Sequence, residues 1–320
     1  MKGAGGCATN VFALSIRVGM KRERWRISVI GAGRLGTAMA LALAARGYQI
    51  EAFVTRRKGH AERARRLLRE RDPAANPRAL SAAQLTELPA CDLLLIATPD
   101  DEIKEVARSL ASALPSGPSG GVALHTSGAL SSEELRPLRE AGWRVGSLHP
   151  LVSISDARSG AGRFAGAFFC LEGERSALKA GRRIAHDLGG FAFSIPPEKK
   201  ALYHAAAVIA SGHTAALFSL ALELFQRCGL RHKEAQRALI PLLRSTVENL
   251  SAKLPARAMT GTFARGDVET VKRHLAVLSA QPEALEIYRL LGLRALRLAA
   301  PSAREEIESL LRLKGKVRRK

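Results

Sequence analysis

Residues 26–57, RISVIGAGRLGTAMALALAARGYQIEAFVTRR, contain the pattern that decides the fold. The apolar run RISVI ends at Gly31 and is typical of a buried strand. The alanine- and leucine-rich run after it is a strong helix former that ends at Gly47. A second apolar run, QIEAFVT, comes next. Gly31, Gly33 and Gly36 thus form a G-x-G-x-x-G motif between a strand and a helix, as a dinucleotide-binding loop requires.

Each glycine of this motif has its own physical role. Gly31 permits a tight turn, Gly33 lets the backbone approach a pyrophosphate, and Gly36 lets the helix pack closely on the strand. The amide groups of Arg34 and Leu35, at the start of the helix, would face the phosphates. The strand–turn–helix–strand context favours this interpretation over a turn in an α/β unit that binds nothing.

The end of the second strand indicates which dinucleotide is bound. A site that prefers NAD places an acid there for the ribose 2′-hydroxyl, but Glu51 lies too early in the strand. The strand instead ends in Thr55, Arg56 and Arg57, followed by Lys58. Arginine can hold a 2′-phosphate with two hydrogen bonds, so we predict NADP(H) as the cofactor. The alternative is a solvated basic loop in a basic protein.

The overall charge bears on the class of partner. The chain has 320 residues and a net charge of +21, which raises nucleic acid as a candidate partner. Its arginines, however, are spread along helices and interleaved with acids, and the one tail-like basic run is the terminal KGKVRRK. Aromatic residues make up 5% of the chain, which is poor for base stacking. We therefore expect no specific nucleic-acid partner.

The cysteines and apolar runs bear on location. Cys7, Cys91, Cys170 and Cys228 are scattered, without a C-x-x-C pair. This indicates reduced, mostly buried thiols in a cytoplasmic protein, with neither a metal site nor a disulfide framework. No apolar run approaches the ~20 residues of a membrane-spanning helix, so we expect no membrane association.

The pattern along the chain predicts three parts. Residues 1–24 are expected to be a disordered leader. In residues 25–197, apolar strand-like runs alternate with amphipathic helical segments, which predicts a doubly wound Rossmann-type α/β sheet. No strand pattern returns in residues 198–320, which are expected to form an all-helical domain for substrate binding and dimerisation.

Some local expectations are specific enough to test. Residues 60–71 are predicted to form a charged helix, and residues 72–90 a loop-rich connection. Residues 199–229 read as one long helix that is apolar on most faces, which indicates burial within a domain or a dimer interface. The stretch 260–267, TGTFARGD, lacks helical periodicity, and Asp267 is expected to cap the helix that follows.

Several motifs together resemble one known family. They are IATPDDEI, HTSGAL, GSLHPL, YHAAAVIASGHTAAL and TGTFARGDVETVKRHL. Over residues 26–300 the chain is similar to a family of predicted oxidoreductases that join a Rossmann domain to a helical C-terminal domain of unknown function. The family is related in architecture to pyrroline-5-carboxylate reductase, ketopantoate reductase and the 3-hydroxyacid dehydrogenases.

The resemblance implies NADP-dependent reduction of a small carbonyl or imine, either a 2-oxo acid such as ketopantoate or a cyclic imine. It also implies a homodimer built on the helical domain. Relatives commonly carry Asn at the position of Gly212 and Pro at that of Thr262. If that Asn binds substrate, its role passes here to Ser211 or His213, or to no residue. The alternative is an NADP(H)-binding regulatory or scaffold protein without turnover, which the replacement by Gly212 favours slightly.

Polar residues follow three successive strands of the predicted sheet. Ligands of open α/β sheets bind at the carboxyl ends of the strands. This places Thr98, Pro99, His125 and Ser127 at the cofactor and makes His149 a candidate catalytic residue. The alternative for each histidine is a structural hydrogen-bonding role.

The helix that opens the second part carries Lys200, His204 and Ser211, which share one face among alanines. Delivery of a hydride to a carbonyl needs an acid, and Lys200 or His204 could supply it. Because relatives among the hydroxyacid dehydrogenases use a lysine on this helix, Lys200 is slightly favoured. The alternative is that Lys200 is solvated and His204 only packs.

Three further residues are candidates for substrate binding. Ser211 lies on the shared face, and His213 lies on a neighbouring one. Arg265 precedes a helix start and could bind a substrate carboxylate with two hydrogen bonds. An arginine that only braces its loop is the alternative.

Overall fold

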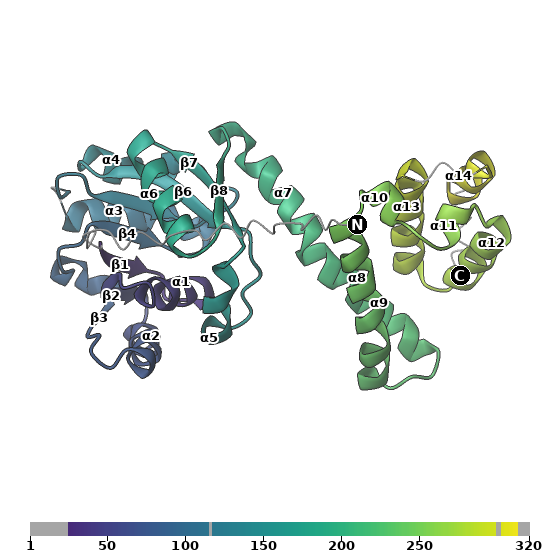
Figure 1. Cartoon of the computed structure of the whole chain (residues 1–320), viewed down its shortest axis with the longest axis horizontal. Helices are drawn as coiled ribbons and strands as arrows, with labels where there is room; N and C mark the ends of the chain where they lie inside the picture. The colour runs from purple at the N-terminus through teal and green to yellow at the C-terminus, as the bar shows by residue number, and fades with distance from the viewer. Residues whose placement is uncertain (1–24, 115–116, 299–301, 313–320) are drawn as a thin grey trace, which may run out of the picture. The chain divides into compact units, whose positions relative to one another are not determined.

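The computed structural model describes residues 25–114, 117–298 and 302–312 (Figure 1). The expected leader, residues 1–24, lies outside this part of the chain. The structure divides between Ser211 and Gly212 into two compact units. The predicted boundary at residues 197/198 lies earlier, just before the helix that ends the first unit.

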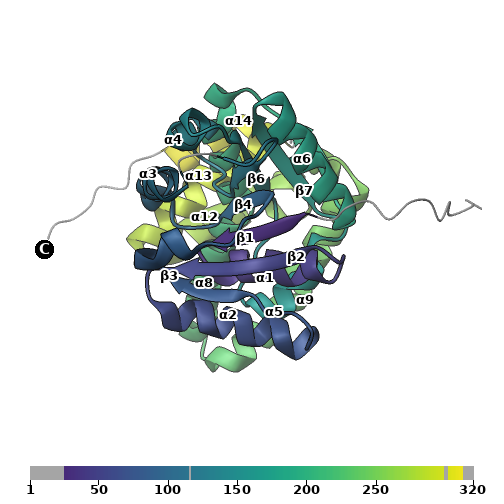
Figure 2. The same ribbon diagram turned by 90° about the vertical axis from the view of Figure 1, so that its left-hand side faces the viewer.

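The first unit contains one eight-stranded sheet, with strand order β3-β2-β1-β4-β5-β6-β7-β8. Neighbouring strands are parallel except for β6 and β7. Figure 2 shows β3, β2, β1 and β4 side by side in this order. The strands are β1 (Arg26–Ile30), β2 (Gln49–Thr55), β3 (Arg78–Ser81), β4 (Leu93–Ile96), β5 (Val122–His125), β6 (Arg144–Pro150), β7 (Phe168–Gly173) and β8 (Phe191–Ser194).

Helices cover both faces of this sheet, and each face has its own apolar core. One core takes side chains from α1 and α6, and the other from α3 and α4. The central strands are buried on both sides, as their continuous apolar sequences require. The predicted doubly wound architecture is confirmed. The helices of this unit are α1 (Arg34–Ala44), α2 (Lys58–Arg71), α3 (Ile103–Ala113), α4 (Arg136–Glu140), α5 (Ala157–Gly160), α6 (Arg175–Asp187) and α7 (Lys200–Ala210).

The prediction of a loop-rich connection over residues 72–90 is wrong in part, because it contains β3. Arg78–Ser81 is only four residues long and buries just Ala79 and Leu80, so its own pattern is weak. Pairing with β2, a tertiary interaction, makes it the edge strand. The helix predicted over 60–71 begins two residues earlier, at Lys58.

The long helix predicted over residues 199–229 is interrupted. α7 ends at Ala210, and α8 begins at Gly212. At Ser211 the backbone leaves regular helical geometry (φ −117°, ψ −70°). A Ser-Gly pair is a common place for such a break, because glycine weakens a helix interior.

The described part of the second unit is helical. The stretch 260–267, predicted without a helix, contains the one-turn α11, and the expected cap is confirmed because Asp267 accepts a hydrogen bond from the backbone N–H of Thr270 at 3.0 Å. The elements are α8 (Gly212–Arg227), α9 (His232–Ala252), α10 (Pro255–Ala258), α11 (Thr262–Arg265), α12 (Val268–Leu278), α13 (Pro282–Leu298) and α14 (Arg304–Arg312).

One helical stretch, Pro197–Arg227, is long and apolar enough to cross a membrane by length and composition, with a mean hydropathy of 1.6. Counting consecutive apolar residues overlooked it, because scattered Ser, Thr and His residues interrupt the run. A single helix of this kind is weak evidence for a membrane. Cys91 and Cys170 are buried free thiols, as predicted, whereas Cys228 is exposed.

Candidate dinucleotide-binding and active site

Two glycines of the loop between β1 and α1 are required by their surroundings. Gly31 has φ +94°, and a Cβ there would lie 2.6 Å from the carbonyl carbon of Ala97. A Cβ on Gly36 would lie 2.1 Å from the carbonyl oxygen of Gly31. Both distances are impossible for a real side chain, so the loop can take this path against β4 only with glycine at both positions.

Gly33 differs, because no atom of the described residues lies within 4 Å of where its Cβ would be. It is exposed and directly precedes α1, whose first residue, Arg34, is also exposed, while Leu35 is half-buried. No side chain caps this helix start. The first amide groups of α1 therefore remain available to an anion, and the open space at Gly33 lets a phosphate come close.

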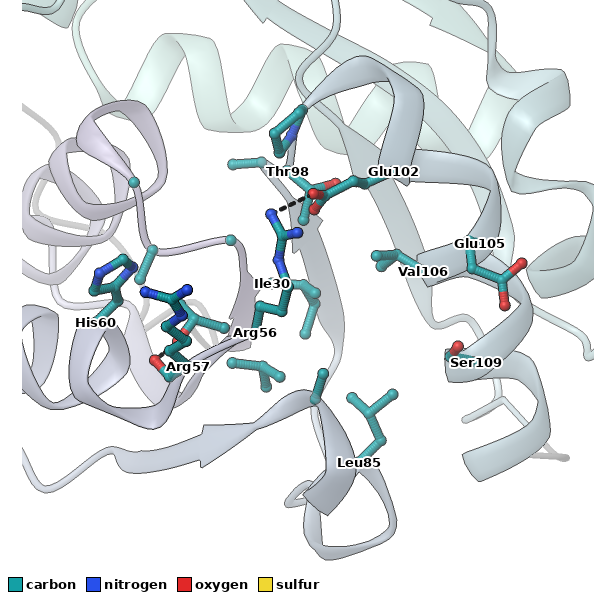
Figure 3. Close-up of a pocket in the computed structure, with 18 of the residues that line it drawn as sticks. Ile30, Arg56, Arg57, His60, Leu85, Thr98, Glu102, Glu105, Val106 and Ser109 are labelled. Atoms are coloured by element: carbon teal, nitrogen blue, oxygen red, sulfur yellow. Dashed lines mark hydrogen bonds and ion pairs between the residues drawn. The ribbon is translucent and has the colours of Figure 1, made fainter.

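A pocket of about 680 Å³ adjoins this loop (Figure 3). Its walls come from the ends of β1, β2 and β4 and from the first turns of α3. Of the predicted cofactor residues it is lined by Gly31, Gly33, Thr55, Arg56, Arg57, Thr98 and Pro99.

The charges of this pocket lie on opposite walls. Arg56 and Arg57 follow β2, whereas Asp101 and Glu102 lie in the short turn before α3 and Glu105 lies in its first turn. Arg56 reaches across and forms an ion pair with Glu102 at 2.6 Å (Figure 3). The Arg56 side chain is 80% exposed, so this pair is held weakly and can be exchanged for a ligand phosphate.

Thr98 supplies an independent sign of a ligand. Its hydroxyl oxygen is buried and has no hydrogen-bond partner among the described residues. A buried hydroxyl without a partner is costly, and a ligand that lies against the end of β4 would supply one. The open amide groups of α1 and this hydroxyl together fit a dinucleotide.

His125 is placed differently from the other strand-end residues. It is fully buried. Its Nε2 lies 3.0 Å from the carbonyl oxygen of Ser131, and its Nδ1 accepts the backbone N–H of Ser127 at 3.2 Å. Burial, and secondly the charge of Lys200, lower its pKa to about 3. The ring is therefore neutral and braces the loop after β5, with neither nitrogen left for a ligand.

Ser127 and Lys200 hold the same loop from two sides. The Ser127 hydroxyl donates to Asp100 at 2.8 Å. Lys200 is only 1% exposed, and its Nζ donates to the carbonyl oxygen of Ser127 at 2.8 Å and to the hydroxyl of Ser147 at 3.0 Å. Burial lowers the pKa of Lys200. The lysine thus lies beneath the loop and not on an open cleft face.

His149, His204 and Tyr203 form a cluster next to this loop. His149 Nδ1 lies 2.7 Å from the Tyr203 hydroxyl, and the two imidazole rings meet edge to face with centroids 5.4 Å apart. Burial, and then the charge of Lys200, lower the pKa of His149 to about 4, while burial raises that of Tyr203. His204 Nδ1 is buried without a partner among the described residues.

Gly128 fits closely against this cluster. A Cβ there would lie 2.3 Å from His204 Nδ1 and 2.9 Å from His149 Nε2. The HTSG backbone therefore lies against the edges of both imidazoles. The structure brings Lys200, His204, His149 and Ser127 together at one end of the sheet, and the predicted roles of these residues remain predictions.

Of the three predicted substrate residues, Ser211 ends the first unit, and His213 and Arg265 belong to the second. Ser211 is exposed at the end of α7. His213 and Arg265 are exposed on α8 and α11 of the second unit. Their roles remain predictions.

Sequence reasoning missed Tyr203, Ser147, Glu172 and Gly128. Ser147 lies two residues before His149 on β6, so period-two alternation places both on one face of the sheet. Glu172 is a carboxylate inside the apolar strand AFFCLEG, which signals a buried charge in need of partners. Gly128 gives no such signal, because its importance comes from contacts with distant residues.

Comparisons with known proteins agree with this geometry. Residues 12–150 match the Rossmann-like domain, and residues 167–295 match a domain of unknown function, DUF2520. No curated protein matches the sequence.

Solved structures are similar over most of the chain. A Bacteroides fragilis protein described as a candidate NADP oxidoreductase is 21% identical, with a TM-score of 0.69, and the match covers 85% of this chain and 98% of that one. Protein TM1727 of Thermotoga maritima is 26% identical, with a TM-score of 0.62 and coverage of 89% and 100%. The pyrroline carboxylate reductase of Plasmodium falciparum, solved with NADP bound, is 14% identical, with a TM-score of 0.55 and coverage of 90% and 98%.

Proposed function

We propose that this chain, which joins a Rossmann-like domain to a DUF2520 domain, is an NADP(H)-dependent oxidoreductase that reduces a small carbonyl or imine. The geometry of the glycine loop carries the proposal. Gly31 and Gly36 fix the turn, and Gly33 leaves the start of α1 open to a pyrophosphate. The similarity to solved NADP-binding folds supports it.

The basic end of β2 supports NADP(H) over NAD(H). Arg56 and Arg57 line the pocket, and β2 carries no acid at its end. A 2′-phosphate would bind Arg56 in place of Glu102, exchanging a carboxylate for a group with more charge and more acceptor oxygens.

The cluster beside Gly128 supports reduction. Bound NADPH would supply a hydride to the substrate carbon. We place the proton donor at His204 or His149, with Lys200 holding the Ser127 carbonyl and thereby the loop on which both imidazoles rest. His204 Nδ1 is buried and has no partner among the described residues. A buried polar atom without a partner is costly, and a substrate group that enters the cluster would supply one. We further propose Ser211, His213 and Arg265 for substrate binding.

The direct test incubates the purified protein with NADPH and a panel of 2-oxo acids and cyclic imines, beginning with ketopantoate and pyrroline-5-carboxylate. Loss of the reduced nicotinamide's absorbance with one of them supports the proposal. Tight binding of NADPH without turnover on the whole panel would instead support the regulatory alternative. A His204→Ala protein is the matched control for nonenzymatic oxidation.

We also propose a homodimer built on the helical unit. On α9, Leu242, Val247 and Leu250 are 63%, 53% and 50% exposed, which is unusual for large apolar side chains in water. A second copy would cover them. Sedimentation at micromolar concentration should show a dimer, and Leu242→Glu with Leu250→Glu should dissociate it. A wild-type monomer would contradict this proposal.

A further inference from the structure

Three buried polar side chains form a hydrogen-bonded chain through the interior of the first unit. Lys200 on α7 donates to the hydroxyl of Ser147 on β6 at 3.0 Å. That hydroxyl donates to Glu172 on β7 at 3.3 Å. Lys200 and Ser147 are each 1% exposed and Glu172 is 3% exposed, so all three side chains are almost fully removed from bulk water. A serine hydroxyl has one hydrogen, so accepting from Lys200 directs it to Glu172.

The surroundings of Glu172 suit a carboxylate. Besides Ser147, it accepts the backbone N–H of Ser132 at 2.7 Å and the Ser132 hydroxyl at 2.8 Å. Every one of these partners is a donor, so the acceptor-only ionised form is satisfied. A buried carboxylate and a buried ammonium are each costly alone, and the path through Ser147 lets each offset the cost of the other.

The other end of the chain reaches the proposed catalytic cluster. Lys200 donates to the carbonyl oxygen of Ser127 at 2.8 Å. The next residue, Gly128, fits against His149 and His204 so closely that no Cβ can be added. A shift of the lysine would therefore move the backbone that sets the position of both imidazoles.

We propose that Glu172 is a positioning residue: through Ser147 it keeps Lys200 protonated and bound to the Ser127 carbonyl, which fixes Gly128 against His149 and His204. The catalytic consequence rests on the proposed function, but the link between Glu172 and Lys200 does not. The other groups facing Lys200 are Asp100 after β4, His125 on β5, His149 on β6 and Cys170 on β7. Among them Glu172 is joined to the lysine by a continuous path of hydrogen bonds.

The test observes the Lys200 ammonium by NMR in protein labelled with ¹⁵N-lysine, with its signal assigned by its loss in Lys200→Met. In Glu172→Gln, which keeps the shape and removes the charge, the pKa of Lys200 should fall by ~1–3 pH units, the effect of losing an opposite charge at short range. The matched control is Glu174→Gln. Glu174 also lies next to the pocket of about 520 Å³ that Glu172 lines, but it pairs with Arg139. The control should leave the titration of Lys200 unchanged.

Ser147→Ala is a second variant that removes the connecting hydroxyl and keeps both charges. It should also lower the pKa of Lys200, by less than Glu172→Gln does. On a confirmed substrate, Glu172→Gln should move the pH profile of kcat to lower pH while leaving the Kd for NADPH within about twofold, since the cofactor pocket is separate. A Lys200 that titrates at the same pH in wild type, Glu172→Gln and Ser147→Ala would overturn the inference. Because the NMR measurement needs no substrate, absence of turnover would count against the proposed function alone.

Discussion

In the first unit, the polar groups around β1, β2 and β4 differ from those around β5, β6, β7 and α7 in whether the protein itself supplies their hydrogen-bond partners. At the ends of β1, β2 and β4, the structure leaves polar groups open: the amide groups after Gly33, the buried hydroxyl of Thr98 and the exposed side chain of Arg56. Around β5, β6, β7 and α7, buried polar groups bond to one another, as Lys200 and Glu172 each do to Ser147. A polar group without a partner in the protein can bind a ligand, whereas a network whose hydrogen bonds are all made holds its side chains in fixed positions.

The difference predicts how each of these two regions responds to change. Exposed charges at the cofactor pocket contribute little to stability, so substitutions there should alter binding alone. Removing one partner of a buried polar pair lowers the stability of the fold by more, because the remaining group stays buried without a hydrogen-bond partner. Substitutions around β6 should therefore alter stability as well as chemistry.

The largest expected effect is acid destabilisation through the buried region around β5, β6, β7 and α7. His125 and His149 are held neutral with pKa values of about 3 and about 4, below the 6.5 of an exposed histidine. The unfolded chain binds protons below pH 6.5 and the native state does not, so stability falls as the pH drops from 6.5 towards 4. Below pH 6.5, each histidine should lower the free energy of unfolding by about 1.36 kcal/mol per pH unit, which amounts to ~2 kcal/mol at pH 5.

Urea unfolding at pH 7 and pH 5 measures this loss. The wild type should lose ~4 kcal/mol from the two histidines together, and His149→Gln should lose about half as much. The exposed His60→Gln is the matched control and should behave as the wild type does. Equal losses in wild type and His149→Gln would show that the histidines do not cause the pH dependence.

Substitutions in the glycine loop should separate folding from binding. Gly36→Ala places a methyl group 2.1 Å from the Gly31 carbonyl oxygen and should cost at least the ~1–3 kcal/mol of an overpacked core. Gly33→Ala meets no atom of the protein and should keep the wild-type Tm, but weaken NADPH binding by ~10-fold through the loss of a phosphate contact. Thermal unfolding and NADPH titration of both variants check this, and a normal Tm for Gly36→Ala would contradict the geometry.

The proton donor gives the next effect. His204→Ala should lower kcat by ~100-fold, the usual share of general acid catalysis, with NADPH affinity nearly unchanged. Lys200→Ala should also lower kcat, because it releases the Ser127 carbonyl and with it the loop that contacts His204. Because Lys200 is buried and His204 only partly so, Lys200→Ala should also lower the Tm. Steady-state kinetics on a confirmed substrate decide the matter. Near-normal turnover in both variants would leave this face of α7 with a packing role and direct the search to His149 or His213.

The smallest effect concerns the exposed ion pair across the cofactor pocket. Glu102→Gln frees Arg56 and should tighten NADPH binding by less than ~1 kcal/mol, the range of surface ion pairs. Glu105→Gln, on the same wall but without a bond to Arg56, is the matched control. Calorimetric titration compares the two. Weaker NADPH binding by Glu102→Gln would mean that the carboxylate contributes to the cofactor site.

Much of the candidate cofactor pocket, at the ends of β1, β2 and β4, could be predicted from the sequence because the local sequence pattern determines it. The spacing of Gly31, Gly33 and Gly36 between a strand and a helix specifies the loop, and the charges at Arg56 and Arg57 follow directly on β2. The edge strand β3 could not be predicted, because pairing with β2 stabilises it more than its own four residues do.

The polar network around β5, β6, β7 and α7 depends on contacts between residues far apart in the sequence. The chain from Lys200 through Ser147 to Glu172 joins three elements and cannot be read from any one of them. The helical pattern placed Lys200 and His204 on one face but could not show that the lysine lies beneath the loop after β5. The same holds for His125, whose ring nitrogens both bond to backbone groups.

The central claim is that the open pocket with Arg56 and Arg57 at the end of β2 binds NADP(H). Its direct test is titration of NADPH and NADH into the wild type and into Arg56→Ala with Arg57→Ala. Wild-type protein should bind NADPH more tightly. The double variant should lose ~1.5–3 kcal/mol of NADPH binding for each charge-assisted contact removed, while NADH binding stays nearly the same. Equal weakening of both cofactors, or no binding of either to the wild type, would contradict the account.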